Sequence, residues 1–225
     1  MSHPQPGRGS SAGLADQPAE FAARFLSAFL RDDPAAMRLT LQQATEACDL
    51  GECLDGVLLP GMRAIGALWQ SGHCSIEKER LATECARGWL QSHEVLVPEP
   101  DGGSPVVLAC GPTDEHSLGL EALGILLRYQ GQDCRLLGAR VSSRTLVTAI
   151  RASLPAAVVI VSHLRVNRDR AAESLWTAQE WVPDLFYAGN AFATPELRRD
   201  VPGTYLGTRL QAAASLILAT VDPGR

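Results

Sequence analysis

One stretch near the middle of the chain decides the fold: Val106-Val107-Leu108-Ala109-Cys110-Gly111-Pro112-Thr113-Asp114-Glu115-His116-Ser117-Leu118-Gly119. Its apolar first part predicts a buried strand, and its last residues begin a helical pattern. In an open α/β sheet, ligands bind in the loop after the first strand, because strand carboxyl ends and a helix N-terminus converge there. We therefore expect His116, which lies in this loop, to face a ligand.

The residue types in this loop indicate what such a ligand could be. Asp114 stands two residues before His116. A carboxylate that accepts one ring N–H fixes the histidine tautomer and makes the other ring nitrogen a better metal donor. Gly119 lets a bulky group approach the start of the helix. The pattern Asp-x-His-x-x-Gly is short, however, and an ordinary polar loop between a strand and a helix is the alternative explanation.

Downstream of this loop, short apolar runs alternate with helical patterns. The uninterrupted run of residues 156–161 is typical of a strand buried on both faces of a parallel sheet. Strict alternation predicts a doubly wound, flavodoxin-like (Rossmann-like) α/β domain with a five-stranded parallel sheet. The expected strands are residues 106–110, 134–137, 158–161, 185–188 and 204–206, and the expected helices are 118–129, 143–153, 170–181 and 210–220.

Upstream, apolar residues recur every three or four positions from residue 18 to 97, as in amphipathic helices. Turn formers divide the pattern into four segments, with expected stops that include 32–34 and Gly51. Ser75 is a candidate N-cap of the fourth helix. Pro60 either kinks the third helix or marks its start. Four helices joined by short turns predict an antiparallel four-helix bundle.

These patterns predict the domain organisation. Residues 1–17 are rich in Gly, Ser, Pro and Gln and cannot bury enough apolar surface to offset the entropy of ordering, so we expect a disordered tail. The helical bundle should cover residues 18–97, a linker of turn formers 98–104, and the α/β domain 105–225. A chain of 225 residues is long enough for two small domains.

Composition narrows the class of protein. With 46% hydrophobic and 20% charged residues the chain reads as globular, and its net charge of −5 argues against a nucleic-acid-binding surface. Six scattered cysteines without a Cys-x-x-Cys pair favour reduced thiols over a disulfide framework. No apolar run approaches the ~18 residues that span a bilayer, and no signal-peptide pattern begins the chain. We therefore expect a cytoplasmic protein without direct nucleic-acid or membrane binding.

Two further motifs follow later strands of the expected sheet. Ser162-His163-Leu164 comes after the third strand, and Gly189-Asn190 comes after the fourth. Together with Asp-x-His-x-x-Gly, they resemble the motifs of cobalamin-binding domains of the methionine synthase and mutase type, over residues 105–221. Asn190 departs from this family, which usually has a second glycine, so a side chain stands where the family has none.

This resemblance implies a cofactor and a set of contacts. His116, supported by Asp114, would replace the benzimidazole base as the lower cobalt ligand of cobalamin (vitamin B12). The displaced nucleotide tail would lie in a slot lined by Ser162, Leu164 and Gly189, next to Asn190.

The turn between the third and fourth helices carries another motif. Trp69 is followed after nine residues by Glu79-Arg80. This spacing resembles the helical cap of the CarH-type light-sensing cobalamin photoreceptors and their stand-alone relatives, which have Trp-x9-Glu-His in this turn. The resemblance implies that Trp69 and Glu79 enclose an adenosyl group on the upper cobalt face. An indole can stack on adenine, and a carboxylate can accept from ribose hydroxyls.

The motif also departs from that family. Arg80 replaces the motif histidine, and Gln70 stands where the light sensors often place the histidine that caps cobalt after photolysis. A bis-histidine state through position 70 is therefore excluded, and His73 is the candidate substitute ligand. Each residue has an ordinary explanation too: Trp69 as core, Glu79 as a favourable charge at a helix N-terminus, and Arg80 or His73 as surface residues.

The joint occurrence of these motifs predicts cobalamin binding and leaves three functions open. The favoured one is a photoreceptor rather than an enzyme, in which adenosylcobalamin lies between the cap and the α/β domain and light changes the activity of a protein partner, such as a transcription regulator. The second is a corrinoid methyl carrier that serves separate methyltransferases. The third is a storage or delivery module, which needs only the lower-face motif. Methylcobalamin and hydroxocobalamin are the alternatives to adenosylcobalamin as the bound cofactor. The partner, the upper ligand and a homo-oligomeric state stay open.

Overall fold

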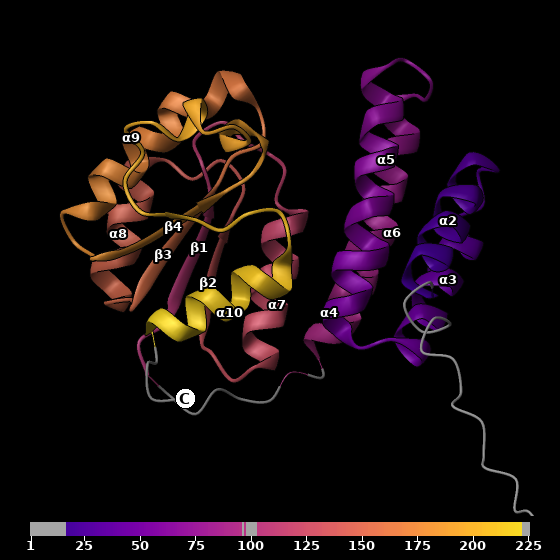
Figure 1. Ribbon diagram of the computed structural model, residues 1–225, viewed down its shortest axis with the longest axis horizontal. Helices are drawn as coiled ribbons and strands as arrows, with labels where there is room; N and C mark the ends of the chain where they lie inside the picture. The colour runs from indigo at the N-terminus through magenta and orange to yellow at the C-terminus, as the bar shows by residue number, and fades with distance from the viewer. Residues whose placement is uncertain (1–16, 96, 98–102, 222–225) are drawn as a thin grey trace, which may run out of the picture. The chain divides into compact units, whose positions relative to one another are not determined.

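The computed structural model describes residues 17–95, 97 and 103–221 (Figure 1). The chain divides into two compact units between Ala86 and Arg87, a boundary that falls inside one long helix. The expected disordered tail lies outside the described residues except for Gln17, which begins a helix, and so does most of the expected linker. The domain boundaries inferred from the sequence therefore stay a prediction.

The described part of the first unit is helical, and its elements match the four expected segments. Asp33 caps the second segment, where its carboxylate accepts the Ala36 N–H at 2.9 Å. Pro34 follows at the first helical position, where no N–H is needed. The elements are α2 (Gln17–Leu30), α3 (Pro34–Ala47), the continuous run α4 (Leu50–Glu52), η1 (Cys53–Leu58) and α5 (Leu59–Gln70), and the first part of α6 (Ile76–Glu94).

The third segment begins earlier than the sequence indicates. Gly51, an expected stop, lies inside α4 because Asp49 and Glu52 form a capping box across it, with hydrogen bonds of 2.8 and 3.1 Å. Pro60 is the second residue of α5, and the six residues Cys53–Leu58 that precede this helix form a π-helix. Since proline lacks an N–H, a widened turn before it lets the helix continue through the position where the sequence predicted a kink or a helix start.

The second unit confirms the expected α/β fold. Five parallel strands pair in the order β2-β1-β3-β4-β5, which is the flavodoxin-like order. The elements are β1 (Val106–Cys110), α7 (Leu118–Tyr129), β2 (Cys134–Gly138), α8 (Ser143–Ser153), β3 (Ala157–Val161), η2 (Arg165–Asn167), α9 (Arg168–Gln179), β4 (Asp184–Ala188), η3 (Asn190–Phe192), η4 (Glu196–Arg198), β5 (Thr204–Tyr205) and α10 (Leu210–Val221).

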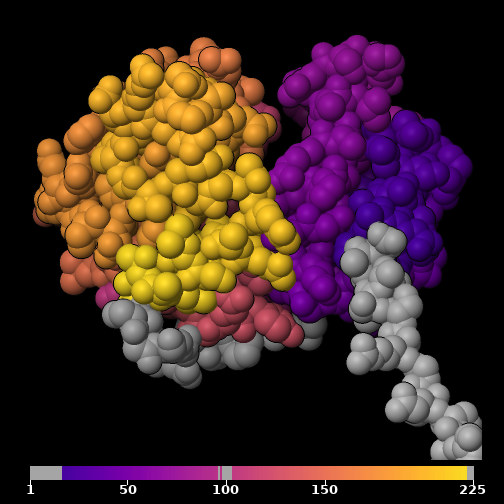
Figure 2. All heavy atoms as spheres, in the orientation of Figure 1, coloured from indigo at the N-terminus to yellow at the C-terminus, as the bar shows by residue number. Residues whose placement is uncertain are grey.

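Helices cover both faces of this sheet. Alternate residues of β1 and β3, such as Val107 and Val158, pack in one buried cluster with Leu146 of α8 and Leu175 of α9. On the other face α7 packs with α10, and α10 lies at the surface in the space-filling view (Figure 2). The central strands β1 and β3 are buried throughout, which explains their uninterrupted apolar sequences.

The register of the sheet brings the three downstream motifs together. Cys110 at the end of β1 pairs with Val161 at the end of β3, and Val161 pairs with Ala188 at the end of β4. The loops that follow these three strands therefore emerge side by side, and each carries one motif. No helix in the described ranges has the length and apolarity needed to cross a membrane. The six cysteines are free thiols.

Candidate functional site

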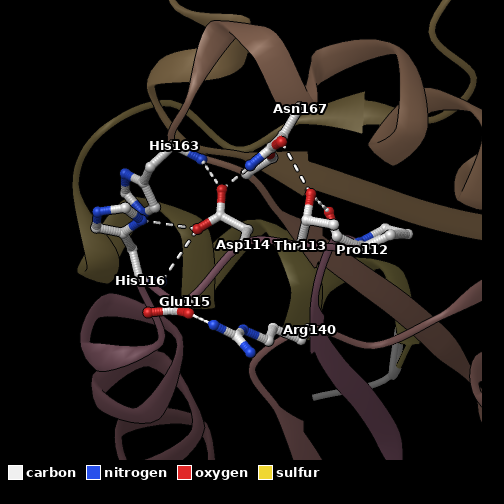
Figure 3. A network of polar contacts seen from close by, with 9 residues as sticks. Pro112, Thr113, Asp114, Glu115, His116, Arg140, His163 and Asn167 are labelled. Atoms are coloured by element: carbon white, nitrogen blue, oxygen red, sulfur yellow. Dashed lines mark hydrogen bonds and ion pairs between the residues drawn. The ribbon is translucent and has the colours of Figure 1, made fainter.

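The buried carboxylate of Asp114 is the centre of a polar network at the carboxyl edge of the sheet (Figure 3). Its Oδ1 accepts the His116 backbone N–H at 3.0 Å and lies 2.8 Å from the His116 ring Nδ1. Its Oδ2 accepts the Ser162 hydroxyl at 3.0 Å and the His163 N–H at 2.6 Å. Four hydrogen bonds therefore compensate for burying one charge.

These bonds decide the ionisation of Asp114 and the tautomer of His116. Burial by itself raises the pKa of Asp114, but the bonds from the His116 ring and from the N–H groups of His163 and His116 outweigh it and hold that pKa well below its ordinary range. An ionised carboxylate only accepts, so the neutral imidazole carries its proton on Nδ1 and its lone pair on Nε2. With a side chain that is 48% exposed, His116 can offer Nε2 to a metal.

The loop that carries these residues is tied down on both sides. Thr113 has a φ of 66°, an uncommon conformation for a β-branched residue. The Asp114 N–H donates to the Gly111 carbonyl at 3.1 Å, and the Arg140 N–H donates to the Asp114 carbonyl at 2.9 Å. The Thr113 hydroxyl lies 2.9 Å from the Asn167 Oδ1. Contacts to the neighbouring loops after β2 and β3 therefore stabilise the Asp114 loop.

The start of the helix that follows is open at Gly119. Gly119 is the second residue of α7, and a Cβ built there would meet nothing within 4 Å. Within the described ranges, no cluster of three or more His, Cys, Asp or Glu side chains could hold a bare metal ion. A single imidazole beside open space fits a metal that arrives with its other ligands already bound, as in a cofactor.

The motif residues after β3 and β4 have structural contacts that the sequence did not indicate. Ser162 is fully buried, and its hydroxyl supports Asp114. Gly189 has a φ of 103°, and a Cβ there would lie 2.1 Å from the Ser162 carbonyl oxygen, so this glycine is required by the protein itself. Leu164, 42% exposed, and the exposed Asn190 can reach a ligand. That these residues line a slot for a nucleotide tail stays a prediction.

In the first unit, the motif residues lie on either side of the turn between α5 and α6. Trp69 is the second-last residue of α5 and is 41% exposed, which argues against a role in the core. Glu79 lies in the first turn of α6, and its Oε1 accepts the Thr83 hydroxyl at 3.0 Å. Ser75 caps α6 as expected, accepting the Lys78 N–H at 3.3 Å. Arg80 is exposed.

His73 lies exposed in the same turn, and its tautomer follows from one contact. Its Nδ1 is 2.8 Å from the Ser71 hydroxyl oxygen, which itself lies 2.8 Å from the Ala67 carbonyl and 3.1 Å from that of Leu68. The single hydroxyl proton of Ser71 is used on a carbonyl, so its oxygen accepts from Nδ1–H. His73 therefore has its lone pair on Nε2, the same tautomer as His116.

Three contributors were missed from the sequence. His163 provides a backbone donor to Asp114, and its ring centroid lies 5.5 Å from that of His116. Asn167 contacts Thr113, and Thr83 orients Glu79. Only Thr83 had a local signal, because it lies four residues after Glu79 on the same face of a helix. The other two depend on loops that are far apart in the sequence.

A further network begins one residue after His116. The Ser117 hydroxyl donates to Glu121 Oε1 at 2.6 Å, and Arg87 Nε donates to Glu121 Oε2 at 3.1 Å. A second ion pair, seven residues further along both helices, joins Arg128 and Glu94 at 2.8 Å. These two ion pairs hold the C-terminal part of α6 parallel to α7. The first turn of α7 follows closely after His116 in the sequence.

Comparisons of sequence show which known proteins the chain resembles. Residues 22–92 match the model of the B12 binding domain family. The chain is 30% identical over 151 residues to the HTH-type transcriptional repressor CarH of Myxococcus xanthus, covering 66% of this chain and 50% of CarH. It is 35% identical over 100 residues to the HTH-type transcriptional repressor CarA of the same organism, covering 44% of this chain and 33% of CarA.

The chain therefore spans half or less of the curated relatives that it matches. Among solved structures, the monomethylamine corrinoid protein of Methanosarcina barkeri superposes with a TM-score of 0.74, covering 90% of this chain and 98% of that one. At 12% identity, this similarity shows that the two share a fold.

Proposed function

Because the chain is a cobalamin-binding protein that resembles the repressor CarH, we propose that it holds adenosylcobalamin and acts as a light-responsive regulator of a protein partner. The observation that carries the proposal is the pairing of Asp114 with His116, which leaves Nε2 as a metal donor in an exposed ring. When bound, adenosylcobalamin supplies a cobalt–carbon bond that light can break. The residues of the chain bind and orient the two faces of the cofactor.

On the lower face, His116 is the proposed cobalt ligand. Asp114 keeps the proton of His116 on Nδ1 and directs the ring, and the Ser162 hydroxyl holds Asp114 in turn. Such supporting contacts are worth about 10- to 100-fold in metal affinity. The open space at Gly119 admits the macrocycle, and Leu164 and Asn190 contact the tail.

On the upper face, Trp69 and Glu79 are proposed to recognise the adenosyl group. The exposed indole of Trp69 offers a stacking surface for adenine, and Glu79, oriented by Thr83, keeps a second carboxylate oxygen for ribose hydroxyls. His73, whose Nε2 carries a lone pair, is the candidate to occupy the upper cobalt position after the adenosyl group leaves. Arg80 stands where a histidine would complete the photoreceptor motif.

The test compares two cofactors that differ only in the upper group. Trp69→Ala should weaken adenosylcobalamin by about ten- to a hundred-fold, because base–aromatic stacking is worth about 1–3 kcal/mol, and should leave methylcobalamin unchanged. Titration of the cofactor-free protein with each cofactor in the dark measures both affinities. Trp176→Ala, which removes another half-exposed indole on α9, is the matched control. Equal losses for both cofactors would refute adenosyl recognition.

A corrinoid methyl carrier is the second candidate. Gln70 and Arg80 favour it, since both depart from the photoreceptor motif. A carrier needs no stacking on Trp69, so the two-cofactor titration separates the candidates. Absorption spectra and gel filtration of the adenosylcobalamin complex before and after green light then test regulation: a carrier predicts no light-dependent change in elution volume or in partner binding.

A further inference from the structure

His163 lies at the end of β3, directly after Ser162, and it meets the His116 site in two ways. Its backbone N–H donates to Asp114 Oδ2 at 2.6 Å, a contact that any residue except proline could make at this position. Its side chain makes a separate contact: the ring centroid lies 5.5 Å from that of His116, with the planes tilted by 49°. Figure 3 shows the two rings next to each other on the same side of Asp114.

A single hydrogen bond does not fix the direction of an imidazole ring. The contact between Nδ1 and Asp114 Oδ1 holds one atom of the His116 ring, and the ring can still tilt about that contact. The His116 side chain is 48% exposed, so solvent faces about half of its surface. A second flat ring at 5.5 Å lies within the range of about 4.5–7 Å where aromatic rings attract each other.

We propose that His163 is a positioning residue, whose ring packs against the His116 ring and fixes the direction in which Nε2 points. The packing requires a flat ring and needs no nitrogen from His163. The identity of the metal rests on the proposed function, whereas the packing is a property of the protein without its cofactor. The sequence motif Ser-x-Leu does not specify the residue at this position, so His163 is a feature of this chain and not of the motif.

The size of the effect follows from the cost of ordering a ligand. A ring that is already fixed loses no rotational freedom when a metal binds, so preorganisation appears as affinity. An aromatic pair contributes enough for about a two- to tenfold change in a binding constant. His163→Ala should therefore weaken cobalamin binding by about this factor, less than the loss of His116 or Asp114.

The first measurement uses the cofactor-free protein. NMR of ring-labelled histidine reports the fraction of His116 that has its proton on Nδ1. Wild-type protein should show one tautomer, and His163→Ala should show a mixture, because a mobile ring leaves Asp114 more often. His163→Phe keeps a flat ring without nitrogen and should restore the single tautomer. Val166→Ala, an exposed residue of η2 three positions on, is the matched control and should match wild type.

The second measurement uses protein loaded with hydroxocobalamin, whose visible spectrum gives affinity and the histidine-ligated fraction. His163→Ala should lower both and His163→Phe should restore both. Two results would overturn the inference: wild-type behaviour of His163→Ala, or equal loss in both variants, which would assign the role to a ring nitrogen. Failure of wild-type protein to bind cobalamin would instead refute the proposed function and leave the NMR result to decide about His163.

Discussion

In the wild-type protein each carboxylate oxygen of Asp114 accepts two hydrogen bonds. Asp114→Asn keeps the shape of the side chain but replaces one of these oxygens with an NH2 group, which donates. If the amide faces Ser162 and His163, the serine hydroxyl can turn to accept, but the His163 N–H meets another donor at 2.6 Å. If it faces His116, the backbone N–H at 3.0 Å meets a donor, and Nδ1 can accept only after its proton moves to Nε2. Each orientation leaves one part-buried N–H without an acceptor.

The magnitude follows from these bonds. A hydrogen bond to a charged group contributes about 1.5–3 kcal/mol, and an unsatisfied buried donor costs about 1–3 kcal/mol. We therefore expect Asp114→Asn to lower the free energy of unfolding of the α/β unit by about 2–5 kcal/mol. Cobalamin affinity should fall by about 10- to 100-fold, because the second orientation also removes the lone pair from His116 Nε2.

Urea unfolding followed by circular dichroism at pH 7 measures the loss of stability. Asp184→Asn makes the same chemical change at a half-buried aspartate at the start of β4 and is the matched control. A loss below about 1 kcal/mol for Asp114→Asn, or equal losses in both variants, would refute the view that the Asp114 carboxylate organises the two loops.

The same variant should have a pH signature. Because the folded pKa of Asp114 lies below its ordinary value, its ionised form stabilises the protein fully above the unfolded pKa of about 3.9, and this contribution is lost as the pH falls through the folded pKa. The stability difference between wild type and Asp114→Asn should therefore shrink as the pH falls below about 4. A difference that persists unchanged into acid would contradict this.

Three further outcomes test the structure. Gly189→Ala should unfold at a lower urea concentration than wild type even without cofactor, because its Cβ would meet the Ser162 carbonyl oxygen at 2.1 Å. In the same assay Gly119→Ala should be neutral or stabilising by up to about 1 kcal/mol, since its Cβ meets nothing within 4 Å. Gly119→Leu should keep this stability but lose cofactor binding in the titration. Burial, followed by the charges of Asp114 and Glu121, raises the pKa of Cys110 to about 12. Iodoacetamide at pH 8 should therefore label the partly exposed Cys74 well before Cys110, as measured by peptide mass spectrometry. Equal labelling rates would contradict the burial of Cys110.

Much of the fold was readable from the sequence because its signals are local. Helices α7 and α8 begin and end where the apolar spacing predicts, and the buried run before residue 161 identified β3 and a parallel sheet. The loop position of His116, with an acid two residues before it, was likewise readable, because their contact spans only two positions. The early start of α4 was missed, since a glycine between the partners of a capping box looks like a stop.

Only the tertiary structure shows which contacts each motif residue makes. Ser162 and Gly189 were predicted as ligand contacts, which stays a prediction; the structure adds that Ser162 supports Asp114 and that Gly189 permits two loops to touch. The partnership of His163 with His116 depends on β3 pairing with β1 in one register, which places residues 47 positions apart at the same sheet edge. Hydrogen bonds and ring contacts act over a few ångströms, so they depend on how strands are ordered in space, and apolar periodicity does not encode that order.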